Sequence, residues 1–279
     1  MRMDHQLRAA VVGLSGLLSS SALAAELPLW EIGAGVAAVG LPDYRGSDHR
    51  RTYFLPSPYL IYRGPLLKAD REGVRASFFE SDRLEINLSL NLAPVSGDED
   101  NPSRQGMKPL RPMAELGPTA DIELWRSSDG KRGLTLRLPV RAAVTLESSP
   151  RHAGWVFSPN LYWSARDPFG RSGWKFSLQA GPIVAARSHN AYFYSVRPEE
   201  AGPDRPAYAA PGGYAGAQAA AVLSKRFARH WIGAYARYDH LGGAVFNDSP
   251  LVRRRTALTA GIAVAWVFGV SSTTVKAED

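Results

Sequence analysis

The chain has 279 residues, a net charge of +7 and no cysteine. A protein without cysteine cannot use the disulfide framework that stabilises many small secreted domains. Beyond the N-terminal 25 residues, no run of 18 apolar residues occurs, so the sequence predicts no transmembrane helix.

Residues 1–24 have the three regions of a secretory signal peptide. Arg2 and Arg8 supply the positive charge, residues 9–18 form the apolar segment, and Ala22-Leu23-Ala24 is a cleavage pattern. The apolar segment is too short to stay in a membrane as a helix, which needs roughly 20 apolar residues. We therefore expect cleavage after Ala24 and export of the mature chain.

The positive charge is carried mainly by arginine. Because we expect the protein to be exported, fewer anionic partners are possible for this charge. An exported protein rarely meets nucleic acid, so we expect no nucleic-acid partner. Phosphates of lipopolysaccharide are the better candidates, because the guanidinium group binds phosphate through two parallel hydrogen bonds. An arginine-rich codon usage explains the same composition equally well.

The mature chain alternates apolar and polar residues over long stretches, which is typical of β-strands with one face in an apolar environment. Leucine or isoleucine occupies every second position from Leu84 to Leu92, and similar runs cover 134–146, 155–163 and 174–184. The polar faces carry charges such as Arg137 and Arg141, which suit a wet lumen better than a dry sandwich core. Ten or more residues is also the length of a tilted transmembrane strand. The sequence thus predicts an all-β protein, an antiparallel transmembrane β-barrel, in preference to a periplasmic sandwich or solenoid.

The predicted barrel occupies residues 25–268 and is followed by a polar tail, 269–279. A bacterial barrel should have an even number of strands, whereas the patterns give 11, so one assignment between residues 41 and 82 must be wrong. Either 65–78 splits at Asp70–Gly73, giving 12 strands, or two pieces merge, giving 10; we prefer 12. The expected strands are 28–40, 52–62, 65–78, 83–94, 114–126, 132–147, 154–165, 173–187, 213–225, 230–241 and 256–268.

Loop length predicts the orientation, because the long connections of such barrels are extracellular and the short turns periplasmic. The long connections are 95–113, 188–212 and 242–255. The short ones are 127–131, 166–172 and 226–229. The last strand ends at Trp266-Val267-Phe268, and the tail beyond it is expected in the periplasm.

Charged residues on the polar faces are the candidates for lumen residues. Across facing strands they either pair and fill the lumen or form a charged constriction that selects solutes; both interpretations stay open. These lumen candidates are Glu85, Glu123, Arg137, Arg141, Lys175, Arg237 and Asp239.

No pattern points to catalysis, and we expect a protein that is not an enzyme and has no cofactor. The histidines fit no zinc motif, so we expect no metal site. A lipid-acting barrel enzyme built on His240 and Ser249 is the alternative we favour least.

Short motifs in the loops resemble the MipA/OmpV family of outer-membrane proteins, over roughly residues 28–268. They are Pro42–Ser47, Tyr192–Val196, Tyr208 with Gly212-Gly213-Tyr214, and Asp248–Val252, in this order behind a signal peptide. The loop residues that carry the resemblance are Tyr44, Gly46, Ser47, Tyr192, Phe193, Gly212, Gly213, Ser249 and Pro250.

The resemblance implies a Gram-negative outer-membrane location, in contact with outer-membrane lipids and lipopolysaccharide. It also implies a scaffold that interacts with a lytic murein transglycosylase and a penicillin-binding murein synthase. Other family members are linked to adhesion, antibiotic response or permeability, so a narrow channel for small solutes is the alternative function.

Overall fold

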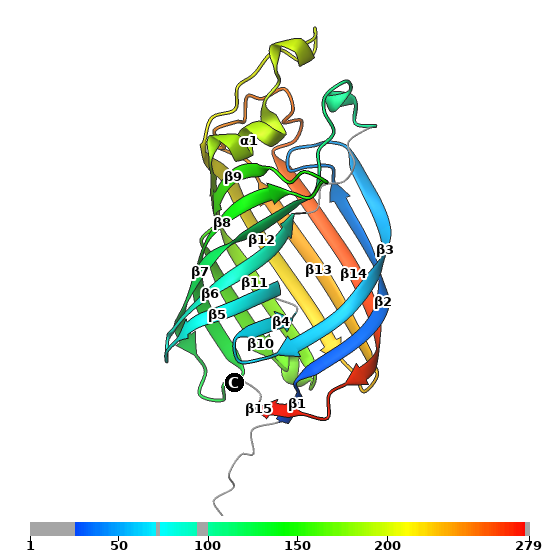
Figure 1. Ribbon diagram of the computed structural model, residues 1–279, viewed down its shortest axis with the longest axis vertical. Coiled ribbons are helices and arrows are strands. Elements are labelled where there is room, and N and C mark those ends of the chain that lie inside the picture. The colour runs from blue at the N-terminus through cyan, green and yellow to red at the C-terminus, as the bar shows by residue number, and fades with distance from the viewer. Residues whose placement is uncertain (1–25, 71–72, 94–99, 277–279) are drawn as a thin grey trace, which may run out of the picture.

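The computed structural model describes residues 26–70, 73–93 and 100–276. The predicted signal peptide lies outside the described residues. Neighbouring strands run antiparallel and close into a tall barrel (Figure 1). The wall consists of β2 (Trp30–Pro42), β3 (Arg50–Arg63), β4 (Leu67–Asp70), β5 (Gly73–Glu80), β6 (Leu84–Ala93), β7 (Met113–Arg126), β8 (Arg132–Thr145), β9 (His152–Phe157), β10 (Asn160–Arg166), β11 (Trp174–Ala185), β12 (Gly213–Arg226), β13 (His230–His240) and β14 (Thr256–Val270).

The barrel closes where β14 pairs with β2, from Ala260↔Gly40 to Val270↔Glu31. On the opposite side, β9 and β10 both pair with β8 and with β11, so these two segments share one position in the wall. Within the described ranges the barrel therefore has 12 strands, and the predicted all-β barrel is confirmed.

The strand assignment that was uncertain between residues 41 and 82 is settled by a division of one predicted strand into two. Residues 65–78 divide between β4 and β5, which form a tight hairpin in which Asp70 faces Gly73. Gly73 has a φ of +123°, a backbone conformation that residues with a Cβ rarely adopt. Nη1 of Arg75 donates to Oδ2 of Asp70 at 2.9 Å and holds the two short strands together. The preferred count of 12 strands follows from this hairpin.

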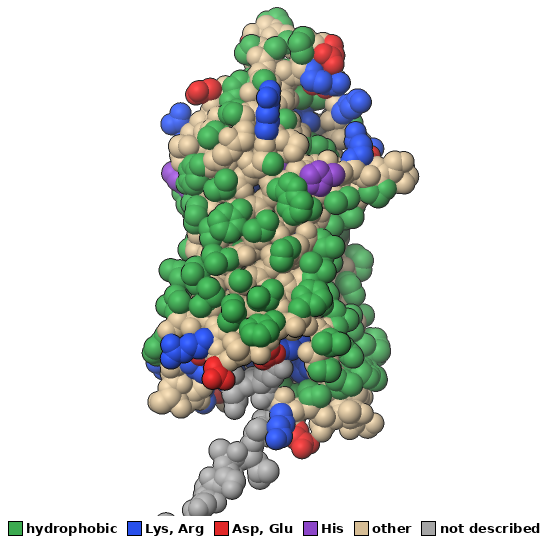
Figure 2. Space-filling model, turned by 60° about the vertical axis from the view of Figure 1, so that its left-hand side comes forward, with side chains coloured by type: hydrophobic (Ala, Val, Ile, Leu, Met, Phe, Trp, Pro, Cys, Tyr) green, Lys and Arg blue, Asp and Glu red, His purple; other side chains and the backbone are tan. Residues whose placement is uncertain are grey.

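The outer face of the barrel is apolar over its middle (Figure 2). Phe54 and Phe268, for example, leave 82% and 68% of their surface exposed, as expected for side chains that contact lipid instead of a protein core. In the same view, lysine, arginine and acidic side chains gather at the two ends. No helix among the described residues is long and apolar enough to cross a membrane.

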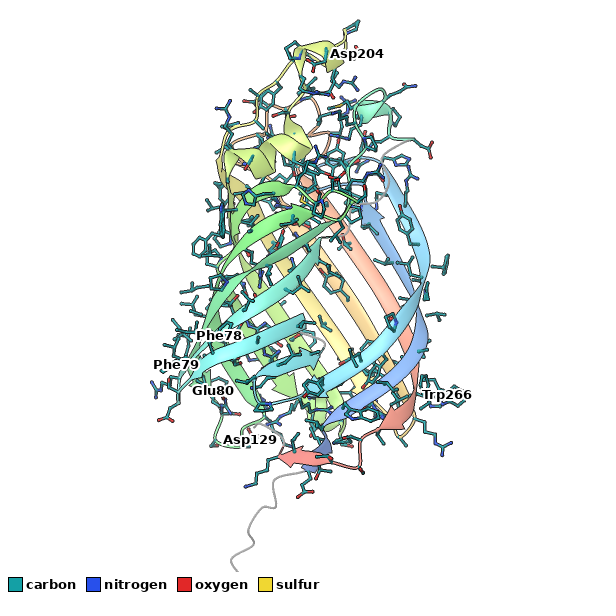
Figure 3. The ribbon with its side chains drawn as sticks, viewed as in Figure 1. Phe78, Phe79, Glu80, Asp129, Asp204 and Trp266 are labelled. Carbon is teal, nitrogen blue, oxygen red and sulfur yellow. The ribbon has the colours of Figure 1, made fainter. Side chains whose placement is uncertain are left out.

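The two ends of the barrel differ in the length of their connections. The long ones carry η1 (Pro102–Arg104), α1 (Arg187–Tyr194) and η3 (Pro198–Glu200), and they lie at the end marked by Asp204 in Figure 3. The opposite end has short turns, including the turn of Asp129. By the length rule the α1 end is extracellular and the Asp129 end is periplasmic.

A second, two-stranded sheet lies at the periplasmic end. β1 (Glu26–Pro28) pairs with β15 (Thr274–Lys276), with Glu26 opposite Lys276 and Pro28 opposite Thr274. Part of the predicted polar tail is thus a strand, and the two ends of the described chain meet there (Figure 1).

Candidate functional site in the barrel lumen

The barrel encloses a cavity of about 1140 Å³. Its lining runs from Phe193 and Tyr194 of α1, at the extracellular end, to Gly130 and Lys131 in a periplasmic turn. A single space therefore reaches through most of the barrel, and the ion pairs of the lumen do not fill it.

Most of the predicted lumen charges line this cavity. Glu123, Arg137, Arg141, Lys175, Arg237 and Asp239 all do, whereas Glu85 is outside its lining. Glu85 instead accepts a hydrogen bond from Ser77 and lies 4.0 Å from Nε of Arg75.

Facing strands bring some of these charges together, as the alternation predicts. Nε of Arg137 lies 3.7 Å from Oδ1 of Asp121 on the neighbouring strand. The Arg137 guanidinium also lies over the ring of Tyr162, 3.5 Å from its centroid, a favourable cation–π geometry. At the periplasmic end, a pair within one strand adds to these contacts: Nε of Arg126 donates to Glu123, three residues earlier in β7, at 2.8 Å.

Asp239 is the most enclosed acid of the lumen, with 3% of its surface exposed. It accepts hydrogen bonds from Nε and Nη2 of Arg237 at 2.9 and 2.7 Å, and from Nε of Arg45 at 2.8 Å. Arg45 comes from the loop between β2 and β3, and its Nη2 also donates to the carbonyl of Ala215 at 2.8 Å. Alternation predicts that Arg237 and Asp239 share a face, but nothing in the sequence predicts the distant Arg45.

Arg141 differs from the other lumen arginines in its partners. Its Nε and Nη2 donate to Oγ of Ser89 at 3.0 and 2.8 Å, and within the described part of the chain it forms no ion pair. The nearby Glu115 accepts instead from Nδ2 of Asn91 at 3.0 Å. The guanidinium of Arg141 therefore lines the cavity without a direct ion-pair partner, although the carboxylates of Glu115 and Asp121 interact with it through space.

Arg141 reaches Ser89 past Gly117, where β7 and β8 approach closely. A Cβ added at Gly117 would lie 2.0 Å from the carbonyl oxygen of Val140. Only glycine permits this approach, so the position of the Arg141 side chain depends on a residue without a side chain.

A further charged cluster lies at the periplasmic end and was missed in the sequence. Glu31 accepts from Nη2 of Arg63 at 2.6 Å, from Nε of Arg226 at 2.8 Å and from the Tyr59 hydroxyl at 3.2 Å. Glu31 lies on the less apolar face of β2, which the alternation could have revealed, but its partners come from strands far away in the sequence.

The extracellular end of the lumen is covered by packed loops, which we call the cap. Its buried apolar core joins α1 to the loops that precede β3, β7, β12 and β14; the members of this core include Tyr44, Leu110, Tyr194, Val196, Ala210, Leu241, Phe246 and Leu251. The motif residues, which lie far apart in the sequence, meet in this cap.

Hydrogen bonds fix the cap loops to one another. The Tyr44 hydroxyl donates to the carbonyl of Leu251 at 2.8 Å, and Oγ of Ser249 donates to the carbonyl of Tyr194 at 2.6 Å. Pro250 follows Ser249 in the same loop. Oγ of Ser47 accepts from Nδ2 of Asn101 at 3.0 Å.

The remaining motif residues also have structural contacts in the cap. The Tyr192 hydroxyl accepts from the backbone of Arg111 at 2.7 Å, and Phe193 packs on Tyr192 with ring centroids 5.0 Å apart. Gly46 and Gly213 have φ angles of +99° and +137°. A Cβ at Gly212 would lie 2.7 Å from the backbone nitrogen of Arg187, where α1 begins.

Burial shifts the titration of the cap residues toward their neutral forms. It raises the pKa of Tyr194 to about 12 and also raises the pKa of Tyr44. Burial lowers the pKa of His189 on α1. The inner side of the cap thus combines buried aromatic groups with contact to the lumen cavity, which Tyr44, His189 and Tyr194 line.

In the described part of the chain, Ser249 is hydrogen-bonded within the cap. Its hydroxyl donates to Tyr194 and accepts from the backbone nitrogen of Leu251, and no hydrogen bond joins it to His240. No group of three histidine or acidic side chains that could hold a metal ion occurs in the described ranges.

The fold and this site define a membrane-spanning β-barrel with an apolar outer belt, a charged lumen and a closed extracellular cap. The chain belongs to the MipA family of outer-membrane barrels: the family model described as MltA-interacting protein MipA matches residues 34–268. The resemblance seen in the loop motifs is thereby confirmed.

Comparison with known proteins shows what the chain is similar to. Outer membrane protein Omp26La of Vibrio anguillarum is 28% identical over 215 residues, which cover 74% of this chain and 76% of that protein. The crystal structure of the outer membrane protein OprG from Pseudomonas aeruginosa shares 9% identity, with a TM-score of 0.21, over 87% of this chain and 94% of that one.

Proposed function

We propose that the protein is an outer-membrane scaffold that docks murein-remodelling enzymes at the periplasmic face. The description of its family, MltA-interacting protein, supports a murein transglycosylase as one partner. A penicillin-binding murein synthase is the second partner that the family resemblance implies.

The sheet of β1 and β15 is the observation that carries this proposal. It lies outside the barrel wall at the periplasmic end, and among the described residues neither of its outer edges has a strand partner. An exposed sheet edge can accept an extended segment of another protein through backbone hydrogen bonds. This edge gives a small barrel a protein-binding surface that its short turns alone lack.

Binding of purified enzymes to the barrel in nanodiscs tests the proposal. We expect the wild type to bind a murein transglycosylase and Val275→Pro to lose that binding, because proline removes the Val275 N–H that faces Leu27 of β1 and so disrupts the small sheet. Asp204→Ala, at the tip of an extracellular loop, is the matched control and should bind normally. Failure of the wild type to bind either murein enzyme would overturn the scaffold function.

A second function, a narrow channel for small anionic solutes, is favoured by the cavity. Arg137, Arg141, Lys175 and Arg237 all lie in its lining, and rings of cations select anions in other pores. Planar-bilayer recording should give a small, anion-selective conductance that Arg137→Ala reduces. Absence of any conductance from the wild-type barrel would remove this function.

The extracellular rim supports contact with lipopolysaccharide. Arg253, Arg254 and Arg255 are consecutive exposed arginines immediately before β14. Arginine pairs well with phosphate, so replacing all three with glutamine should weaken binding to lipopolysaccharide vesicles but not to neutral phosphatidylcholine vesicles. Equal binding of both proteins to lipopolysaccharide would contradict the assignment.

We also propose that the protein has no enzymatic activity. The Ser249 hydroxyl is engaged in the cap, away from any hydrogen bond with His240. Membrane lipid composition should be the same in cells that carry the wild type and the His240→Ala variant. A change in lipid composition that depends on His240 would show that this proposal is wrong.

A further inference from the structure

The barrel wall is incomplete along one side of β3. β3 pairs with β2 over its whole length, from Pro42↔Arg50 to Trp30↔Tyr62, but with β4 at Tyr62↔Ala69 and Arg63↔Lys68 alone. Residues 50–61 therefore have no strand partner on that side within the described part of the chain. Figure 1 shows the ribbon of β3 diverging from those of β5 and β6 toward the extracellular end.

The opposite margin of this seam is the extracellular end of β6. Its last pair with β5 is Leu90↔Val74, whereas Asn91, Leu92 and Ala93 pair with β7 alone. The wall is thus continuous near the periplasm and interrupted above the β4–β5 hairpin. The interruption lies in the extracellular half of the barrel.

The sequence accounts for this interruption. β4 ends after four residues, because the chain reverses between Asp70 and Gly73. β3 contains Pro56 and Pro58, which have no N–H group to donate. Proline within sheets is largely confined to edges and bulges, and it also removes donors that would otherwise be unsatisfied beside lipid.

The lumen cavity reaches this seam. Its lining includes Tyr53 and Leu55, from the inward face of β3, together with Val74, Leu90 and Leu92. The last two lie on the outward face of β6, since Ser89 and Asn91 face the lumen. A cavity lined by both faces of β6 passes around the free edge of that strand.

The margins of the seam are apolar and exposed. Leu55 has 46% and Leu92 62% of its surface exposed, although Leu55 faces the inside of the barrel. Exposed apolar side chains on both margins suit an acyl chain that enters from the membrane. Water alone would leave this inward-facing leucine unfavourably hydrated.

A lumen arginine without a direct ion pair lies close to these margins. Arg141 donates to Ser89, the residue directly before Leu90. The guanidinium thus lies on the lumen face of β6, one residue along the strand from an apolar residue of the margin. Together they match a molecule with an acyl chain and an anionic head group, because arginine binds carboxylate and phosphate oxygens in pairs.

We propose that the seam between β3 and the β5–β6 edge is a lateral opening that admits a single-chain anionic amphiphile from the membrane, with its head group bound by Arg141. The acyl chain lies between Leu55 on one margin and Val74, Leu90 and Leu92 on the other. A cavity of about 1140 Å³ suits one such molecule, since pockets for drug-sized ligands hold about 300–1000 Å³. This role is independent of the scaffold at the periplasmic face.

The test uses the full barrel in phosphatidylcholine nanodiscs, with a dansyl-labelled undecanoate as the probe and hexadecanoate as the competitor. We expect saturable binding by the wild type and a loss of about tenfold or more in Arg141→Gln, the effect of removing one charge-assisted bond. Arg132→Gln is the matched control, because Arg132 lines the same cavity at its periplasmic end. Equal affinities of the wild type and Arg141→Gln would overturn the proposal.

A second pair of variants tests the route. Leu55→Gln with Leu92→Gln should weaken hexadecanoate binding about tenfold, because each places a polar group against the acyl chain. Leu60→Gln, on the outward face of β3, should bind like the wild type. Circular dichroism verifies that each variant keeps its strand content. Identical hexadecanoate binding by the double variant and the wild type would show that the chain does not use the seam.

Competitors distinguish the chemistry and source of the ligand. Displacement of the probe by both hexadecanoate and hexadecyl phosphate supports the site. The relative affinities of these two competitors then show whether fatty acids or phosphate amphiphiles are preferred. Displacement by the cationic hexadecyltrimethylammonium at the same concentration would show that the site binds any alkyl chain on an apolar surface. That result would overturn the role of Arg141. Displacement by a two-chain phosphatidic acid alone would overturn the single-chain assignment.

Discussion

The rings of Tyr194 and Phe246 stack with their centroids 3.7 Å apart and their planes at 10°. Tyr194 ends α1, and Phe246 lies in the loop before β14, so this contact joins two extracellular connections. The Tyr194 hydroxyl donates to the carbonyl of Arg45, at 2.8 Å, and links them to a third. This aromatic pair therefore links three of the extracellular connections that form the cap.

Truncation of Phe246 should open the cap and leave the barrel folded. Phe246 is fully buried, and a buried Phe→Ala change costs about 3–5 kcal/mol. Hydrogen exchange should speed up in 187–196 and 241–252 but not in the strands. Phe227→Ala, in an exposed periplasmic turn, is the control for the same chemical change. Unaltered exchange of α1 in Phe246→Ala would contradict the role of the aromatic pair.

Acidification should loosen α1 through His189. Burial lowers the pKa of His189 below its usual 6.5, so the folded cap resists protonation. Above pH 6.5 the histidine is neutral in the open and closed cap, and its contribution to stability is fully present. As the pH falls below 6.5 the open cap takes up the proton first, so closure weakens until the pH reaches the folded pKa.

Hydrogen exchange of 187–196 at pH 8 and pH 5, corrected for intrinsic rates, measures this effect. His189→Phe should remove the pH dependence, because a neutral ring can keep the packing against Phe193. His152→Phe, on the exposed start of β9, should keep it. A pH dependence that survives in His189→Phe would assign the effect to another group.

A methyl group at Gly117 should disrupt the pairing of β7 and β8. Its Cβ would lie 2.0 Å from the Val140 carbonyl oxygen, so the strands would have to separate. We expect a loss of about 1–3 kcal/mol or more in the free energy of unfolding, as for other overpacked sites. Gly133→Ala, between the same two strands, is the control, because its nearest neighbour would be 3.8 Å away. Similar chemical-denaturation midpoints for the two variants would disprove the steric argument.

Alternation predicted the strands, because the side-chain period of a strand is two, and strand length together with the charges on the polar faces favoured a barrel over a sandwich. It also placed Arg137 on the lumen face, where the structure brings it opposite Asp121 on the adjacent strand. The hairpin of β4 and β5 was accessible for a different reason: Asp70 and Gly73 are turn residues inside an otherwise continuous strand pattern.

The contacts that define the cap were not accessible. Tyr44, Tyr194 and Phe246 lie in irregular loops, where no periodicity relates one residue to another. Arg45 reaches Asp239 across 194 positions of sequence, and the Arg141–Ser89 bond depends on the close approach at Gly117. A single sequence carries no signal for such pairs, so the lumen charges could be named but not their partners.

Loss of the Asp239 carboxylate should free the loop between β2 and β3. Asp239→Asn keeps the shape of the side chain but leaves Arg45 and Arg237 without their shared anion. Removing one partner of a buried ion pair costs about 3–5 kcal/mol, because the remaining charge stays desolvated. We expect a lower midpoint of guanidinium chloride unfolding and faster proteolysis at residues 43–49. Asp129→Asn, in an exposed periplasmic turn, should change neither; if Asp239→Asn behaves like that control, the carboxylate does not hold the loop, and the Arg45–Ala215 hydrogen bond must do so instead.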